Sequence, residues 1–284
     1  MADFDNTALN ATIKELWDET VEESRYAKGV LMNQVSNKSG IAQKKGDIIH
    51  VTIDQKYTVG TVSAAGAFTA QNYTPTTVDI TLNQWEQVAI RVLDRAEAQS
   101  FWTPGSIFPR KVGQAFADRY DGQIAALHSS ITVQVGSATN PSNFDKNLAQ
   151  EAMVTLANAN IPLEDLFFAL NPVAYYNGLC NEEQLTAASK SGMSKNVLMT
   201  GYIFDLFNAP LYLSTNILTV GSPAVKKNML LHKSAIAIAW QKNAEVERAR
   251  ATAAGILADI FVAQSLYGQS VIRADHGVVI NSAA

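Results

Sequence analysis

The stretch that most constrains the fold runs from residue 45 to residue 129, where a long candidate β-hairpin leads directly into one long amphipathic helix. Strand-like segments at 47–57 and 76–93 flank a tip of mostly small residues at 59–74, which reads VGTVSAAGAFTAQNYT. Such a tip offers little apolar surface that its own domain could remove from water. We therefore expect an arm that lies on another molecule and whose tip is mobile in the isolated subunit, which favours an assembly protein over a catalyst. An ordinary surface hairpin is the alternative.

The period of the apolar residues predicts the elements of this stretch. Apolar and polar residues alternate over 49–53 and again over 76–93, so we expect an outgoing strand and a single long return strand. Proline and glycine at 104–105 then break the chain before a helix over 106–128, which would be roughly 35 Å long. The polar face of this helix is expected to carry Asp118, Arg119, Asp121 and Gln123.

Composition narrows the class of protein. The chain has 284 residues, 47% hydrophobic and 17% charged, which is typical of a folded protein. Its formal net charge of −4 and the absence of a basic cluster argue against tight nucleic-acid binding. The single cysteine, Cys180, excludes an internal disulfide and suits a reducing compartment. We find no signal-peptide pattern and no apolar run approaching the ~18 residues that span a membrane, so we expect a soluble protein made in the cytoplasm.

Residues 7–33, ahead of the hairpin, have apolar side chains at helical spacing and an acidic opposite face. Two interpretations stay open for this helix. It could dock on its own core with the acidic face in water, or it could be an arm that packs on a neighbouring subunit. In the second case Trp17 and Glu22 would contact the neighbour.

After the long helix, small polar residues at 132–143 predict a linker, and an α/β region follows over 145–240. Asparagine followed by proline is a typical helix start, because the side chain caps the helix and proline fits its first turn. The elements expected in this region are a helix at 145–158, a buried strand at 166–170, a helix starting at Asn171-Pro172, two short strands within 201–218 and a segment at 230–240 that returns through the interior. Alternation resumes over 260–280 and predicts terminal strands.

No motif of a catalytic or cofactor site is present in the sequence. The phosphate-binding loop, the dinucleotide fingerprint and the G-x-S-x-G elbow are all missing. The histidines lack another histidine or cysteine at ligand spacing, so we expect no metal and no cofactor; they are His50, His128, His232 and His276. Cys180 on an apolar helix is expected to pack rather than to act as a nucleophile. We therefore expect no enzymatic activity.

The densest mixed-charge cluster consists of Asp94, Arg95 and Glu97, just before the long helix. Ordinary surface salt bridges would explain it, and these contribute little to stability. An ion-pair network between subunits is the alternative.

The order of these parts resembles a tailed-phage major capsid protein with the fold of the Hong Kong ninety-seven phage shell. Residues 74–100 (TPTTVDITLNQWEQVAIRVLDRAEAQS) look like the return strand of that family's extended loop and its approach to the spine helix. Residues 169–179 (ALNPVAYYNGL) look like the strand-to-helix step of the axial domain. Residues 228–239 together with 259–280 look like the return into the peripheral domain.

The resemblance implies an α+β phage capsid fold with four parts. These are an amino-terminal arm helix within 1–45, an extended β-hairpin loop at 46–95, a peripheral domain with the spine helix from 96–144 and 241–284, and a central axial domain at 145–240. It implies a virion head, assembled in the host bacterial cytoplasm from hexamers and pentamers, that encloses double-stranded DNA with weak, non-specific contacts. Separate scaffolding, portal and decoration proteins are possible partners, and no membrane is involved.

On this resemblance we expect the assembly interface to involve three regions. The residues are Lys56, Tyr57, Phe68 and Tyr73 in the loop, Arg91, Asp94, Arg95 and Glu97 before the spine helix, and Trp17 and Glu22 in the arm. Some family members link a loop lysine to a neighbour's asparagine, for which Lys56 and Asn281 would be the candidates. Nothing in the sequence around them marks either residue, so we expect non-covalent assembly. The helix expected from residue 7 leaves no room for a fused scaffold, so any scaffold would be a separate protein.

Two other functions stay open. An encapsulin-like compartment would have the same fold but would enclose an enzyme, would have a cargo-peptide groove on its inner wall and would usually lack the amino-terminal arm. A soluble α/β enzyme with a lid-like hairpin would be a stable monomer with a deep polar pocket.

Overall fold

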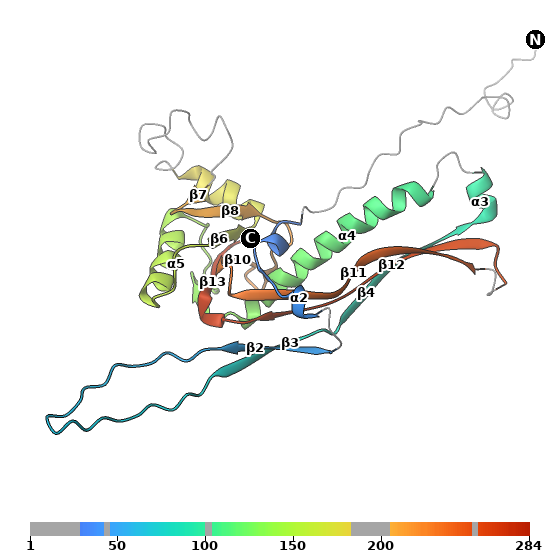
Figure 1. Cartoon of the computed structure of the whole chain (residues 1–284). Helices are drawn as coiled ribbons and strands as arrows, with labels where there is room; N and C mark the ends of the chain where they lie inside the picture. Colours follow the sequence, from blue (N-terminus) through green and yellow to red (C-terminus); the bar gives the residue numbers. More distant parts are fainter. Residues whose placement is uncertain (1–28, 43–45, 100–103, 183–204, 252–254) are drawn as a thin grey trace, which may run out of the picture.

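The computed structural model describes residues 29–42, 46–99, 104–182, 205–251 and 255–284. These residues form three β-sheets and two principal helices, with a hairpin arm that projects beyond the rest (Figure 1). One apolar core joins α4 and the four-stranded sheet to one face of the seven-stranded sheet, and a second lies between the seven-stranded sheet and α5. The third sheet is the base of the arm and has a small core of its own.

The first sheet has four strands and lies along the longest helix. Its strand order is β1 (Ser36–Asn37), β11 (Ile236–Arg250), β12 (Ala258–Val271) and β4 (Gln84–Leu93). Helix α4 (Pro104–Ala126) packs on one face, where Tyr120 meets the Tyr267 ring edge-on at 4.8 Å. The core between them also includes Phe116 and Ala263. This helix confirms the one predicted over 106–128.

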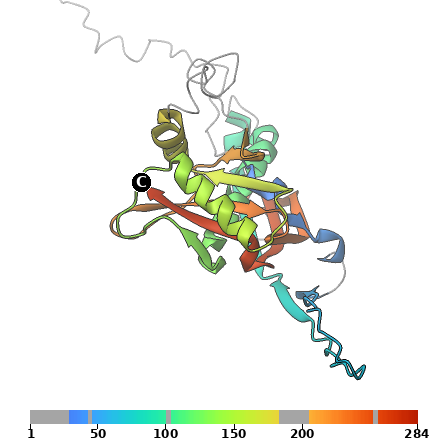
Figure 2. The ribbon, with the colours of Figure 1, turned by 90° about the vertical axis from the view of Figure 1, so that its left-hand side faces the viewer.

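The second sheet has seven strands and is covered by helix α5 (Lys146–Asn158). Its strands are β5 (Val133–Val135), β13 (Gly277–Ala283), β10 (Val225–His232), β6 (Leu166–Leu170), β8 (Ala209–Leu213) and β7 (Asp205–Leu206), with β9 (Thr219–Val220) also paired to β10. All five residues of β6 are buried, which explains why its sequence is an unbroken apolar run. Figure 2 shows α5 crossing this sheet.

The third sheet is the two-stranded base of the arm, formed by β2 (Ile48–Ile53) and β3 (Thr76–Thr81). Ile49 and Ile80 are buried against Ala237 and Ala239 of β11. The remaining short elements connect the sheets; they are α2 (Ser39–Ala42), α3 (Asp94–Gln99), a π-helical turn at Ala174–Gly178 and 3-10 turns at Leu31–Asn33, Leu127–Ser130, Leu179–Asn181 and Ala274–His276.

The helix starts predicted from sequence are confirmed in part. Asp145 caps α5, accepting a hydrogen bond from the Leu148 N–H at 2.8 Å. Asn171 accepts from the Val173 N–H at 3.0 Å, as the Asn-Pro step predicts. The helix that follows, however, is a short π-helical turn at Ala174–Gly178.

The single return strand predicted over 76–93 is wrong, because the chain changes sheets in the middle. β3 pairs with β2, whereas β4 pairs with β12. Leu82, between the two strands, is buried in the core of the arm base, and its N–H donates to the Asp47 carbonyl at 2.7 Å. Alternation looks the same in both strands, so it cannot reveal that they belong to different sheets.

The segment at 230–240 does run through the interior, with 230–231 and 235–239 buried, and residues 233–235 turn the chain from β10 in one sheet into β11 in the other. Two other expectations need correction. The linker expected at 132–143 contains β5, which pairs in parallel with β13. β13 lies in the seven-stranded sheet, and the division of the chain into domains at 144 and 241 stays a prediction. Most of the helix expected at 7–33 lies outside the described residues, and its last part is a 3-10 turn.

Candidate assembly interface

The part of the arm beyond its two-stranded base, residues 54–75, exposes its apolar side chains to solvent. We call this part the arm tip; it includes the small-residue stretch at 59–74. Tyr57 is 55% exposed, Phe68 78% and Tyr73 59%, and Val59 is fully exposed. Lys56 is exposed beside them. The four loop residues expected at an interface therefore lie together on a surface that the described part of the chain leaves uncovered.

A second uncovered surface is the sheet face turned away from α4. We call it the outer face; it is formed by Trp85, Ala89, Leu93, Ile260, Val262 and Leu266, which share one side of β4 and β12 by register. Trp85 is 75% exposed and Leu93 47%. Arg91, expected at an interface, is exposed on the same side of β4.

The base of the arm covers the end of this face at Gly268, next to the Trp85–Leu266 pair. A Cβ built on Gly268 would lie 2.2 Å from the Thr81 carbonyl oxygen, so the two backbones touch there. Only glycine allows this approach. Trp85, paired with Leu266, comes directly after this covered end, and the outer face stays open from Trp85 to Leu93.

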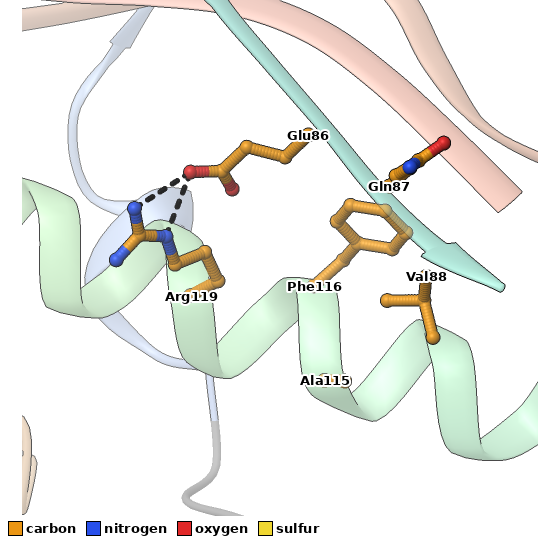
Figure 3. Close-up of a pocket in the computed structure, with 6 residues that line it drawn as sticks. All are labelled: Glu86, Gln87, Val88, Ala115, Phe116 and Arg119. Atoms are coloured by element: carbon orange, nitrogen blue, oxygen red, sulfur yellow. Dashed lines mark hydrogen bonds and ion pairs between the residues drawn. The ribbon is translucent and has the colours of Figure 1, made fainter.

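The opposite face of β4 is held against α4 by an ion pair between side chains and by apolar contacts (Figure 3). The Arg119 guanidinium donates to Glu86 Oε1 from Nε at 2.8 Å and from Nη2 at 2.7 Å. The Tyr267 hydroxyl donates to Glu86 Oε2 at 3.2 Å, and burial raises the pKa of Tyr267 far above its usual range. Phe116 and Val88 lie beside the ion pair. These contacts hold the sheet and the helix together as one unit.

The charged cluster before the long helix pairs within the chain. Arg250 contacts both oxygens of the Asp94 carboxylate, with Nη1 at 2.7 Å from Oδ1, and also reaches Asp259 at 3.0 Å. Arg248 donates to Asp259 from Nε at 2.9 Å. Arg248 and then Arg250 hold the pKa of Asp259 below its usual value. Asp94 therefore forms a salt bridge within the chain, and its contact with another subunit stays a prediction.

The other residues of the expected cluster have different surroundings. Arg95 is exposed, and its Nε lies 3.4 Å from Gln99 Oε1 within α3. Glu97 is half-buried; the pKa of Arg248 is raised mainly by its hydrogen bond to Asp259, and the charge of Glu97 adds to the rise. Trp17 and Glu22 lie outside the described residues. Arg95 and Glu97 remain candidates for contact with another subunit.

Asp121 was expected on the polar face of the long helix, and this expectation is wrong. Its carboxylate is fully buried and accepts backbone N–H bonds from Val30, Leu31 and Met32. Burial raises the pKa of Asp121, and these three bonds partly offset the rise. Helical periodicity gave no signal for this role, because the partners are backbone groups about 90 residues away.

Two of the four histidines lie close together in the described part of the chain. His232 and His276, far apart in sequence, have ring centroids 5.5 Å apart with the Ser234 hydroxyl between them. Within the described ranges, no group of three or more His, Cys, Asp or Glu side chains could hold a metal ion. Burial raises the pKa of the Cys180 thiol, which disfavours the thiolate. None of the described helices is long and apolar enough to cross a membrane.

Asn281, the candidate for a covalent link, points into the fold. It is buried, its Oδ1 accepts from Lys227 Nζ at 2.8 Å, and its Nδ2 donates to the Gly136 carbonyl at 3.1 Å. A neighbour's Lys56 could reach it only if these contacts broke. The expectation of non-covalent assembly therefore stands as a prediction.

Comparison with known proteins identifies the fold. No family model and no curated protein matches the chain. A solved structure from Mycobacterium phage Che8 is 25% identical with a TM-score of 0.80, covering 94% of this chain and 96% of that one. The capsid of cyanophage P-SCSP1u is 14% identical, with a TM-score of 0.79 and coverage of 97% and 94%. The capsid of the native GTA particle is also 14% identical, with a TM-score of 0.71 and 96% coverage of both chains.

These likenesses extend over nearly the whole of both chains, so they concern the complete arrangement of sheets, helix and arm. The chain has the α+β fold of a tailed-phage major capsid protein, as its sequence resemblance implied.

Proposed function

We propose that this chain is a major capsid protein, which assembles with copies of itself into the icosahedral head that encloses phage double-stranded DNA. The observation that carries the proposal is the full-length likeness to phage capsid structures. The similar structures from cyanophage P-SCSP1u, bacteriophage PhiM1 and the native GTA particle are capsids, which are structural rather than catalytic. The virion is accordingly its place of action, after assembly in the host cytoplasm.

The two uncovered surfaces suggest how copies meet. The tip of one subunit would lie across the outer face of the next, so that Phe68 and Val59 lose water against the apolar residues around Trp85. Exposed apolar surface of this kind is typical of protein–protein contact sites. This contact would be lined by Lys56, Tyr57 and Tyr73 on the tip and by Arg91 on the receiving face. Arg95 and Glu97, in α3 just after β4, would lie near the end of the contact.

The remaining assignments follow from the same proposal. The α4 layer with its four-stranded sheet would be the peripheral domain, and the α5 layer with its seven-stranded sheet the axial domain at the centre of hexamers and pentamers. Trp17 and Glu22 would contact a neighbour through the amino-terminal arm. Scaffolding, portal and decoration proteins would be separate chains, and many modest contacts would hold the shell through multivalency.

Deletion of residues 64–72 tests the proposal. The deletion removes exposed chain only, so the subunit should keep its circular dichroism spectrum and its unfolding midpoint. Particle formation, followed by light scattering and negative-stain images, should be lost. Normal particles from the deleted chain would refute the role of the arm.

An encapsulin-like compartment remains the second candidate, because the fold would be the same. Extraction of the particle contents distinguishes the two: a viral head would contain DNA, whereas a compartment would contain one enzyme carrying a docking peptide.

A further inference from the structure

The two segments of the arm tip run alongside each other without a backbone ladder. The last backbone pair of the base is Ile53 with Thr76, and residues 54–75 beyond it form no strand. These residues are almost all exposed, so burial does not hold the segments together. Two glutamine side chains connect them instead.

Gln55, on the outgoing segment, bonds to the return segment through both ends of its amide. Its Nε2 donates to the Asn72 carbonyl at 2.8 Å. Its Oε1 accepts from the Thr74 N–H at 2.7 Å and from the Thr74 hydroxyl at 2.8 Å. The side chain thus takes the place of a peptide group in an antiparallel pair, because a primary amide also carries one acceptor and donor hydrogens.

Gln71, on the return segment, makes the reciprocal contact further out. Its Oε1 accepts from the Thr58 N–H at 3.2 Å, and its Nε2 donates to the Thr58 carbonyl. One glutamine therefore reaches across from each segment, and each pairs with a backbone donor and a backbone acceptor opposite.

The two bridges continue the register of the base. Gln55 and Thr74 each lie two residues outward from the Ile53–Thr76 pair. Thr58 and Gln71 each lie three residues further out. The segments stay aligned while their backbones are separated by a side chain. At the apex, Ser63 and Ala67 close the turn through backbone and hydroxyl bonds of 3.1 Å.

We propose that Gln55 and Gln71 are positioning residues that hold the tip in its docking shape before a second copy of the chain binds it. A tip without them would have to be ordered at the moment of contact, at a cost in backbone conformational entropy. Preorganisation removes part of that cost and so lowers the concentration at which subunits associate. The inference rests on the proposed function, since it names the residues that prepare the same arm for assembly.

The test compares the wild type with the double variant Gln55→Met and Gln71→Met. Methionine keeps an unbranched side chain of similar length but cannot form the amide bonds. Gln150→Met is the matched control, because Gln150 is exposed on α5, away from the arm. The readouts are amide hydrogen exchange at Thr58 and Thr74 in unassembled subunits, and the protein concentration at which particles first form.

We expect exchange at Thr58 and Thr74 to become roughly 2- to 10-fold faster in the double variant, as loss of one net hydrogen bond predicts. The concentration needed for particles should rise several-fold, while Gln150→Met matches the wild type in both readouts. Unchanged exchange, or unchanged assembly despite faster exchange, would overturn the positioning role and leave the proposed function intact. A wild type that never forms particles would overturn the proposed function, and the positioning role with it.

Discussion

The backbone N–H of Leu31 donates to both carboxylate oxygens of Asp121, at 3.0 and 3.2 Å, and both residues are fully buried. Val30 and Met32 donate to the same carboxylate at 2.7 and 3.1 Å. The carboxylate thus fixes the chain to α4 just after residue 29. Residues 30–32 are therefore held at a defined point on the long helix.

Replacing Asp121 with asparagine should lower the free energy of unfolding by roughly 1–3 kcal/mol, because a buried N–H then faces an amide NH2. Urea unfolding of the unassembled subunit measures this. Asp205→Asn is the control, since Asp205 is exposed on β7, and it should have little effect. Equal losses from both variants would contradict the buried role of Asp121.

The same carboxyl group predicts a pH dependence. Burial raises the pKa of Asp121 above its ordinary value of 3.8, so the folded state binds the proton more tightly than the unfolded state does. The stabilisation that comes from this tighter proton binding is therefore fully present when the pH is below 3.8, the pKa in the unfolded chain. It declines as the pH rises through the pKa of the folded state. The stability difference between wild type and Asp121→Asn should shrink from about pH 4 toward neutrality, and a difference that grows would contradict this assignment.

Gly268→Ala should destabilise the subunit by roughly 1–3 kcal/mol, because the new methyl group would overlap the Thr81 carbonyl. Gly122→Ala is the matched control within α4, where nothing lies within 4 Å of the added Cβ. That change should be stabilising by about 0.5–1 kcal/mol. Thermal unfolding of both variants checks the pair, and tolerance of Gly268→Ala would show that the arm base is not in close contact with β12.

Arg250→Gln should make the subunit more sensitive to acid. Arg248 and Arg250 lower the pKa of Asp259 in the folded state. Their stabilising effect is therefore present when the pH is above 3.8, the ordinary pKa of this group, and is lost as the pH falls through the pKa of the folded state. Without Arg250, that pKa rises and acid unfolding should begin at a higher pH. Circular dichroism during an acid titration measures the pH at the midpoint of unfolding. Arg95→Gln is the control and should leave this midpoint unchanged.

Trp85→Ala should impair assembly while leaving the subunit stable, because Trp85 is 75% exposed. We expect a change in unfolding free energy within about 0.5 kcal/mol and a marked rise in the concentration needed for particles. Val154→Ala, an exposed apolar change on α5, is the control. If Trp85→Ala assembles as the wild type does, the outer face around Trp85 is not the receiving surface.

The sequence predicted elements well where one period and a cap described one segment. The long helix, the capped helix α5 and the buried strand β6 are of this kind. It failed where neighbouring segments share a period but join different sheets, as β3 and β4 do at Leu82, and as β10 and β11 do at residues 233–235. Pairing between distant strands leaves no local pattern by which the change of sheet could be seen.

At the candidate interface, too, the sequence predicted local features but not contacts between distant residues. The exposed loop residues such as Phe68 could be predicted, because a tip with so little apolar content has no core to join. The partners of Asp94 and Asp121 could not, since Arg250 and the Leu31 backbone are 156 and 90 residues away. Trp85 looked like part of a strand, and only its place on the sheet shows that it faces solvent.

The mass of the particles formed by the purified chain, measured by light scattering with negative-stain images of the same sample, tests the central claim most directly. The account predicts closed shells, or rings of five and six subunits. A monodisperse monomer near 30.7 kDa that stays monomeric when a scaffolding protein or crowding agent is added would contradict it.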